Sequence, residues 1–323
     1  MKNSIILQGN CIDKIKELKN NSIDCVVSSP PYFGLRDYGV DGQFGLEKTY
    51  QEYIANTVKV FETFKPKLKD TATIWWNVGD SYASNGVYIH KWYEKEKNKN
   101  KKHLHTKNRE RYKDRKAYRS ETIKAKDLMM IPNRVAIALQ ESGWYIRSEI
   151  IWHKPNPMPE SGKDSPTSCH EKIWLITKNK KYYYDADAIR EKGTIPKGTK
   201  GAKGSQERVE QIGVNSRPNE YKIYDGFRNK RNVWTITTKP FREAHFATFP
   251  KDLIEPCIKA GCPEGGMVLD PFGGSGTTGL VANQLGRDAI LIELNKDYAD
   301  MATRRIDNDA PLLSIDKSSH KGV

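Results

Sequence analysis

Apolar positions along the chain follow two alternating patterns. Short apolar runs with many β-branched residues predict strands, and they stand at residues 4–7, 23–27, 71–78, 145–152, 171–177, 267–270 and 289–292. Between them, apolar residues recur every three or four positions, which predicts helices at residues 11–19, 50–65 and 128–140 and further helices within 245–308. Strands that alternate with helices predict an α/β fold built on a mostly parallel sheet.

Two stretches interrupt this pattern. Residues 84–126 hold 15 Lys and Arg against five acidic residues, with few aliphatic side chains, so they cannot build a core of their own. We interpret them as a mobile basic insertion, although a solvated helical face or a loop without any partner has the same composition. Residues 185–231 are rich in Gly, Lys and Arg, which predicts a long irregular segment.

The chain of 323 residues is strongly basic, with 54 Lys and Arg against 40 Asp and Glu and a net charge of +14. This excess favours a polyanionic partner, most commonly nucleic acid, over a basic protein without such a partner. The apolar runs are far shorter than the roughly 20 residues of a membrane span, and the first residues lack the apolar core of a signal peptide. We therefore expect a cytoplasmic protein with no membrane partner. Five cysteines without a CxxC pair indicate reduced thiols and no metal site.

A glycine-rich turn follows the predicted strand at 267–270 and leads into a helix. Glycines let the backbone approach a ligand, and a helix N-terminus offers free N–H groups. Asp270 ends this strand and can meet an amine, and Glu293 ends the next strand, where an acid commonly holds ribose hydroxyls. No P-loop Lys follows, which disfavours ATP hydrolysis, and Asp270 would repel a pyrophosphate. The turn therefore predicts S-adenosylmethionine as the ligand, although a tight βα turn also uses glycines for structural reasons.

A second polar turn, Ser29-Pro-Pro-Tyr32, stands at the carboxyl end of the predicted buried strand 23–27. The prolines make the turn rigid and remove two N–H donors. A hydroxyl, outward-facing carbonyls and an aromatic ring remain, and this set suits a planar group that carries an NH2. The alternative is a stiff surface turn with a tyrosine that packs.

Together these motifs resemble a known family, the S-adenosylmethionine-dependent DNA amino-methyltransferases of the N4-cytosine/N6-adenine type. The residues that carry the resemblance are Ser29–Tyr32, His245–Pro250, Asp270–Gly279 and Ile292–Asn295. The catalytic motif precedes the cofactor motif, which resembles the β group of the family. The resemblance implies a Rossmann-like methyltransferase fold with a circularly permuted sheet. It implies a catalytic half at 1–83 and 127–184 around the basic insertion 84–126, a target-recognition region at 185–231, a cofactor half at 232–308 and a tail at 309–323.

The resemblance also implies roles for individual residues. Ser29 and the Pro30 carbonyl would accept hydrogens from the target amino group, with Pro31 keeping the turn rigid and Tyr32 stacking on the flipped base. The expected S-adenosylmethionine contacts are Asn10, His245, Thr248, Phe249, Asp270, Pro271, Phe272, Gly273, Gly274, Ser275, Gly276, Thr277 and Glu293. Within the basic insertion, we expect Lys99, Lys101, Lys102, Lys107, Arg109 and Arg111 to contact DNA phosphates.

We therefore predict a site-specific DNA methyltransferase that acts on the N4 amino group of cytosine in double-stranded DNA by base flipping and direct in-line transfer. N6-adenine methylation is the first alternative. An amino-methyltransferase with another substrate, or a DNA-binding protein without catalysis, is more remote. A C5-cytosine enzyme is disfavoured because Pro256-Cys257, the one Pro-Cys pair, lies in a helix-like stretch. We expect a monomer or homodimer in a bacterial or phage-infected cell, with a possible cognate restriction endonuclease for the same DNA site.

Overall fold

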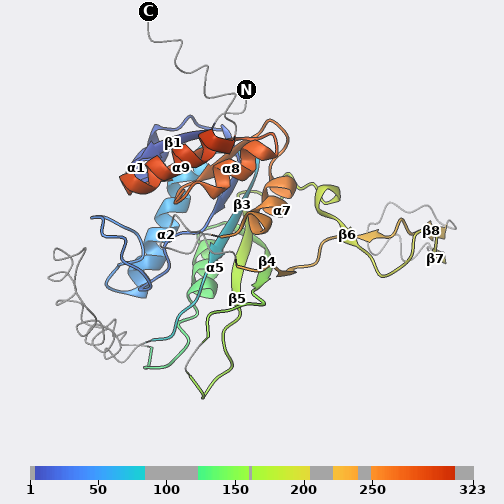
Figure 1. Cartoon of the computed structure of the whole chain (residues 1–323), viewed down its shortest axis with the longest axis horizontal. Helices are drawn as coiled ribbons and strands as arrows, with labels where there is room; N and C mark the ends of the chain where they lie inside the picture. Colours follow the sequence, from blue (N-terminus) through green and yellow to red (C-terminus); the bar gives the residue numbers. More distant parts are fainter. Residues whose placement is uncertain (1–3, 84–122, 160–161, 204–220, 239–248, 310–323) are drawn as a thin grey trace, which may run out of the picture. The chain divides into compact units, whose positions relative to one another are not determined.

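The computed structural model describes residues 4–83, 123–159, 162–203, 221–238 and 249–309 (Figure 1). The chain divides into two compact units, of which the first combines residues 1–184 with residues 232–323 and the second is residues 185–231. The first unit carries the large sheet, and the second carries two short two-stranded ladders.

The first unit is built on a sheet that has eight strands among the described residues. They are β1 (Ser4–Gln8), β2 (Ile23–Ser28), β3 (Leu68–Val78), β4 (Tyr145–His153), β5 (His170–Thr177), β10 (Val233–Thr235), β11 (Met267–Asp270) and β12 (Asp288–Glu293). Their order across the sheet is β1-β12-β11-β2-β3-β5-β4-β10. Neighbouring strands are parallel except where β5 pairs with β3 and β4. The predicted α/β fold with a mostly parallel sheet is confirmed.

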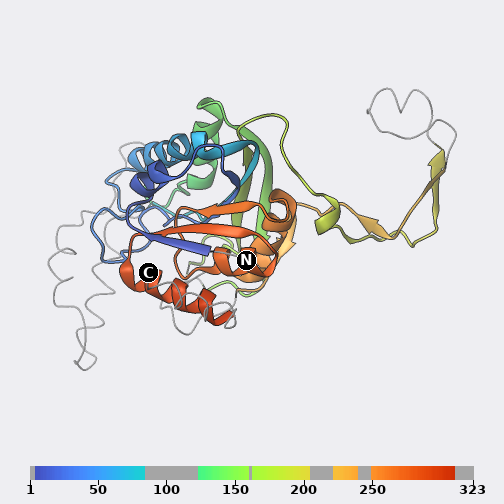
Figure 2. The same ribbon diagram turned by 90° about the horizontal axis from the view of Figure 1, so that it is seen from above.

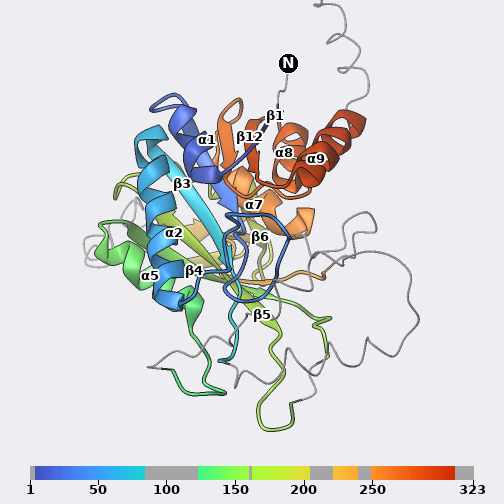
Figure 3. The same ribbon diagram turned by 90° about the vertical axis from the view of Figure 1, so that its left-hand side faces the viewer.

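Helices cover both faces of this sheet. On one face lie α1 (Cys11–Glu17), α2 (Tyr50–Phe64) and α5 (Ile131–Glu141), and on the other lie α7 (Lys251–Gly261), α8 (Thr277–Gln284) and α9 (Lys296–Asp309) (Figure 3). Seen from above, the strands run between the two helical layers (Figure 2). No helix in the described part of the chain has the length and apolar character needed to cross a bilayer.

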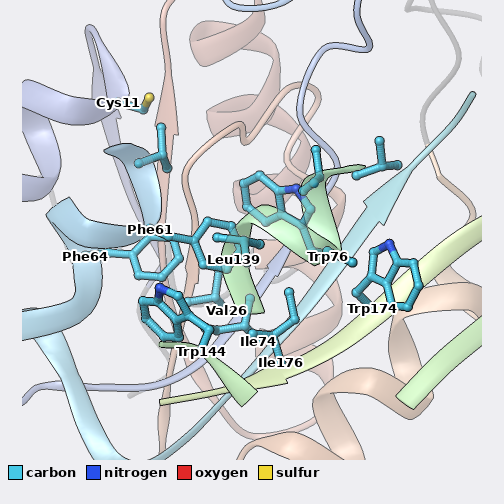
Figure 4. Packing of buried hydrophobic residues seen from close by; sticks show 14 of the residues in the cluster. Cys11, Val26, Phe61, Phe64, Ile74, Trp76, Leu139, Trp144, Trp174 and Ile176 are labelled. Atoms are coloured by element: carbon cyan, nitrogen blue, oxygen red, sulfur yellow. The ribbon is translucent and has the colours of Figure 1, made fainter. Parts of the chain in front are cut away.

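The core lies between the sheet and the layer that α2 and α5 form. Thr49 caps the N-terminus of α2, since its hydroxyl accepts from the Glu52 amide at 3.1 Å. The side chains of Tyr53, Val60, Phe61 and Phe64 in this helix are fully buried. Phe61 of α2 contacts Trp76 of β3 and Trp144, with ring centroids 4.9 Å and 5.4 Å apart (Figure 4). This aromatic packing fixes α2 against β3 and so holds the carboxyl ends of the parallel strands in place.

One helix begins later than its apolar pattern predicts. The predicted helix at 128–140 is α5, which starts at Ile131 because Met130 has a left-handed backbone and Pro132 occupies the first turn. Leu128 instead forms an isolated antiparallel bridge with Tyr82. Strand β3 is also longer than predicted, since it begins at Leu68 and includes polar residues before its buried run.

The second unit contains more regular structure than its composition predicts. Strand β6 (Glu191–Lys192) pairs with β9 (Phe227–Arg228), and β7 (Lys200–Lys203) pairs with β8 (Tyr221–Ile223), both antiparallel. Short 3-10 turns complete the regular elements, η2 (Asp187–Ile189) here and η1 (Lys65–Lys67) in the first unit. The expectation of a long irregular segment is therefore wrong. In the β6–β9 pair, Arg228 and Glu191 face each other across the two strands and form an ion pair at 2.8 Å. Most of the basic insertion predicted at 84–126 lies outside the described residues.

Candidate active site

A pocket of about 780 Å³ opens in the first unit at the carboxyl ends of the parallel strands. Its walls are the segments that directly follow β1, β2, β11 and β12, together with the end of β3 and the region after β4. Because β5 is antiparallel to its neighbours, the first residues of β5 reach the same edge. Ligand sites of open α/β sheets lie at this edge.

The Ser29–Tyr32 turn forms one wall of the pocket. Strand β2 is buried along its whole length, so the turn starts from a rigid base. The Tyr53 hydroxyl of α2 donates to the Pro31 carbonyl at 3.2 Å, which ties the turn to the core. Ser29 is half-buried, and its hydroxyl lies 3.3 Å from Tyr32 Oη.

The Tyr32 hydroxyl lies at the centre of a polar network. It donates to Glu171 Oε2 at 2.6 Å and lies 3.2 Å from Asn77 Oδ1. Glu171 also forms an ion pair with Lys154, and both side chains are largely buried. Burial and the adjacent Glu171 carboxylate raise the pKa of Tyr32 well above its usual range, so the phenol stays protonated at neutral pH.

The Tyr32 ring rests against backbone at Gly79, just after β3. A Cβ atom at Gly79 would lie 2.4 Å from Tyr32 Cε2, which is closer than real contacts allow. Gly79 is therefore needed so that the ring can approach the backbone. The ring edge and the hydroxyl of Tyr32 are thus both held.

The glycine-rich turn follows the neighbouring strand β11, lines the same pocket and is held from beneath by Asp270. The Asp270 carboxylate accepts hydrogen bonds from the hydroxyls of Ser28 and Thr278, both at 2.5 Å, and from the Phe272 amide at 3.1 Å. Burial raises the pKa of Asp270 to about 6. Asp270 is 1% exposed and is absent from the pocket wall, so in this structure it shapes the turn that follows it.

Gly276 shows why the turn requires glycine. It has a positive φ of 81° and directly precedes α8. A Cβ atom there would lie 2.8 Å from the Cβ of Ala302 in α9. Arg305, one turn further along α9, donates to the Ser275 carbonyl and hydroxyl, both at 2.9 Å, and to the Thr277 hydroxyl at 3.0 Å. Helix α9 therefore clamps the turn from behind.

Glu293 closes the pocket beside the turn. Its carboxylate accepts from the Gly274 amide and the Asn295 amide, both at 2.8 Å. Burial raises the pKa of Glu293. Each carboxylate oxygen has a second lone pair, so Glu293 can still accept hydrogen bonds from a ligand in the pocket. Beside it, where the Gly9 amide donates to the Glu293 carbonyl at 2.9 Å, Asn10 lines the pocket and caps α1 by accepting from the Ile12 amide at 2.9 Å.

A family model described as DNA methylase matches residues 23–304 of the chain. The chain belongs to the N4/N6 DNA methylase family. The methylase is 41% identical to the type II methyltransferase M.Cfr9I of Citrobacter freundii over 304 residues, which cover 94% of this chain and 88% of the relative. It is 42% identical to the type II methyltransferase M.SmaI of Serratia marcescens over 301 residues, which cover 93% and 90% of the two chains. The predicted family is confirmed, and the protein is a DNA methyltransferase enzyme.

Solved structures show the same fold. The PvuII cytosine-N4-specific DNA methyltransferase matches with a TM-score of 0.62 and 18% identity, over 94% of this chain and 86% of that one. A candidate DNA modification methylase of Thermus thermophilus, complexed with S-adenosyl-L-methionine, matches with a TM-score of 0.56 and 20% identity, over 96% of both chains. The methylase therefore has the methyltransferase fold that its motifs imply.

The structure brings most of the predicted site residues of the methylase to one pocket. Those that line it are Asn10, Ser29, Pro30, Pro31, Tyr32, Phe249, Pro271, Phe272, Gly273, Gly274, Ser275, Thr277 and Glu293. Asp270 and Gly276 lie behind the turn, where they fix its shape. Outside the described residues are His245, Thr248, Lys99, Lys101, Lys102, Lys107, Arg109 and Arg111.

Sequence reasoning missed a group of pocket residues from the antiparallel part of the sheet. Asn77, Lys154 and Glu171 line the pocket of the methylase together with the Trp152 ring. The Lys154 ammonium lies 4.4 Å from the centroid of that ring. A charged residue at the start of a predicted strand is common in proteins, so Glu171 carries no motif that would have marked it. Groups of three or more metal-ligating side chains are absent from the described part of the chain.

Proposed function

We propose that this methylase transfers a methyl group from S-adenosyl-L-methionine to the N4 amino group of cytosine in double-stranded DNA. The observation that carries the proposal is that the Ser29–Tyr32 turn and the glycine-rich turn face one pocket. A hydroxyl and a carbonyl that can accept hydrogens from an amine thus line the same pocket as a turn suited to a nucleoside with an amino-acid end.

The residues of the pocket fit this methyl donor. The free lone pairs of Glu293 suit ribose hydroxyls, and the backbone of Gly273–Ser275 suits the amino-acid end. Phe249 and Asn10 also line the pocket. Asp270 acts through the turn by fixing the Phe272 amide and the start of α8. When bound, the cofactor supplies an electrophilic methyl group on a sulfonium centre.

The chemistry of the protein is positioning of the amine. An exocyclic amine of a base is a poor nucleophile because its lone pair is delocalised into the ring. Ser29 and the Pro30 carbonyl accept its two hydrogens and favour a pyramidal nitrogen, which returns electron density for in-line attack. Correct orientation can supply roughly 7–11 kcal/mol of the barrier. Tyr32 stacks on the base after it has left the helix, and this offsets part of the few kcal/mol that base flipping costs.

The first residue of the motif supports cytosine over adenine. Ser29 stands where N6-adenine members of the family typically carry Asp, and Ser is more typical of N4-cytosine members. The type II relatives support a role in restriction and modification, in which an endonuclease of the same site acts on unmethylated DNA.

DNA recognition is divided in this proposal between the two basic regions. The 84–126 insertion contacts phosphates, and residues 185–231 read base edges as the target-recognition region. Support for the second assignment comes from the separate compact unit that residues 185–231 form.

Identification of the methylated nucleoside tests the proposal. Unmethylated phage λ DNA is incubated with the full-length protein and cofactor, digested to nucleosides and analysed by mass spectrometry. We expect N4-methyldeoxycytidine. Detection of N6-methyldeoxyadenosine alone would overturn the cytosine assignment, and unmodified DNA would overturn the activity. Ser29→Ala is expected to lower the amount of product about 100-fold. Ser22→Ala is the control and is expected to keep the wild-type level, because Ser22 directly precedes β2, at the end of the strand away from the pocket.

A further inference from the structure

The hydrogen bonds around Tyr32 form a chain with one direction. The Ser29 hydroxyl donates to Tyr32 Oη at 3.3 Å, and Tyr32 donates to Glu171 Oε2 at 2.6 Å. A hydroxyl has one proton and two lone pairs, so the proton of Ser29 is engaged by Tyr32. The lone pairs of Ser29 Oγ are then left for a donor in the pocket.

Asn77 fixes this direction. Its Nδ2 group donates to Glu171 Oε2 and to the Lys172 carbonyl, both at 3.2 Å, and two acceptors for one NH2 group orient the amide. Asn77 Oδ1 therefore faces Tyr32 Oη at 3.2 Å. The single proton of Tyr32 goes to the shorter bond with the charged acceptor, because charge-assisted hydrogen bonds are the stronger ones.

Glu171, the last residue of this hydrogen-bond chain, is largely buried. The Glu171 side chain is 15% exposed, and the Lys154 side chain paired with it is 19% exposed. The Lys154 ammonium also lies over the Trp152 ring. Cation and aromatic ring together fix the carboxylate at the edge of the sheet without blocking the oxygen that faces Tyr32.

We propose that Glu171 receives the proton that the target amine loses, through Tyr32 and Ser29. The inference rests on the proposed function. As the N–CH3 bond forms and the S–CH3 bond breaks, the amine nitrogen must lose one proton. That proton passes to Ser29 Oγ, the Ser29 proton passes to Tyr32 Oη, and the Tyr32 proton passes to Glu171. One proton leaves the amine and one arrives at the carboxylate, so the two hydroxyls end as they began.

Other carboxylates of the pocket have different partners. Glu47 accepts from the Gly45 amide and Asn56, and Glu293 accepts from the glycine-rich turn. Among the described carboxylates that line the pocket, Glu171 is the one that the hydrogen bonds join to Ser29. Glu171 does not touch the target amine. It acts through Tyr32 and Ser29, which it positions and from which it receives the proton.

Single-turnover methylation of λ DNA with radiolabelled cofactor tests the relay. Glu171→Gln keeps the size of the side chain but cannot take a proton, and we expect the rate constant to fall about 100-fold while the cofactor Kd stays within about twofold. Glu149→Gln is the matched control, because Glu149 of β4 pairs with Lys172 of β5, next to Glu171 in the sequence, and does not line the pocket. It is expected to keep the wild-type rate. Tyr32→Phe is expected to cost as much as Glu171→Gln, and the double variant no more than either.

Two readouts separate the relay from a structural role. Sodium formate is expected to restore at least part of the rate of Glu171→Ala, whereas sodium chloride at the same ionic strength restores none. In the free protein, the 13Cζ NMR signal of Tyr32 should shift in Glu171→Gln and not in Glu149→Gln. A full rate in Glu171→Gln, or equal effects of formate and chloride, would overturn the relay. If the wild-type protein methylates no base, the proposed function fails instead.

Discussion

The hydroxyl of Ser28 donates a hydrogen bond to the carboxylate of Asp270 at 2.5 Å. Ser28 ends β2 directly before the Ser29–Tyr32 turn, and Asp270 ends β11 directly before the glycine-rich turn. One buried hydrogen bond therefore joins the bases of the two neighbouring turns that line the pocket. A substitution at either residue is therefore expected to alter the conformation of both turns.

The buried Asp270 predicts a pH-dependent stability. Burial raises its pKa from 3.8 to about 6, so between these values the folded chain holds a proton that the unfolded chain has lost. Stability from this group is therefore full at low pH and falls as pH rises through the window, by about 3 kcal/mol in all. Urea unfolding at pH 4, 5, 6 and 7 should show that the wild-type protein loses most of this free energy of unfolding relative to Asp270→Asn, which cannot ionise. Parallel pH profiles of the two proteins would contradict the assignment.

Replacement of Gly79 by Ala is expected to slow methyl transfer. In Gly79→Ala, the new Cβ atom would lie 2.4 Å from the Tyr32 ring, so the ring must move away from its hydrogen-bond partners. We expect the single-turnover rate to fall at least about 10-fold with little change in cofactor affinity. Gly162→Ala is the control, because the nearest atom to its Cβ, Asp164 Oδ1, lies 3.7 Å away, an ordinary contact. A wild-type rate in Gly79→Ala would show that the Tyr32 position does not matter.

The contacts of Arg305 in α9 with the glycine-rich turn are expected to support cofactor binding. Arg305→Ala removes three hydrogen bonds to Ser275 and Thr277, which loosens the glycine-rich turn. We expect the cofactor Kd, measured by calorimetry, to rise about 10-fold, which corresponds to about 1.4 kcal/mol. Arg304→Ala removes the neighbouring exposed arginine and should leave the Kd unchanged. Equal Kd values for the two variants would contradict the clamp.

The sequence predicted those parts of the site whose residues are consecutive in a motif. Ser29–Tyr32 and the glycine-rich turn each follow a buried strand, so their local pattern was enough to find them. Glu171 could not be found in this way. It reaches Tyr32 because β5 runs antiparallel to β3, and strand direction is decided by packing across the sheet.

The same limit applies to the position that Asp270 takes. Its place at the end of a strand predicted a contact with the amine of a ligand. In the structure, Ser28 and Thr278 occupy its oxygens, and these partners come from a neighbouring strand and from the next helix. The start of α5 was also misplaced, here for a local reason. The apolar pattern begins at Leu128, but the left-handed backbone of Met130 delays the helix until Ile131.

The division of labour between the two basic regions gives the last prediction. Residues 84–126 carry a net charge of +10, with 15 basic and five acidic residues, and phosphate contacts give affinity without sequence information. Replacing Lys99, Lys101, Lys102, Lys107, Arg109 and Arg111 by Gln should therefore weaken binding to cognate and scrambled duplexes alike. The slope of log K against log salt should become flatter by about 0.9 for each phosphate that is no longer bound.

Exchange of residues 185–231 for the corresponding segment of a relative should instead change which sequence is methylated. This segment has 11 basic and seven acidic residues, a net charge of only +4, and its Asn, Gln and Arg side chains can read base edges. Binding isotherms at several salt concentrations compare the Gln replacements with the exchange on both duplexes. If the Gln replacements keep the salt slope but abolish the preference for cognate DNA, the basic insertion reads the sequence and the assignment of 185–231 is wrong.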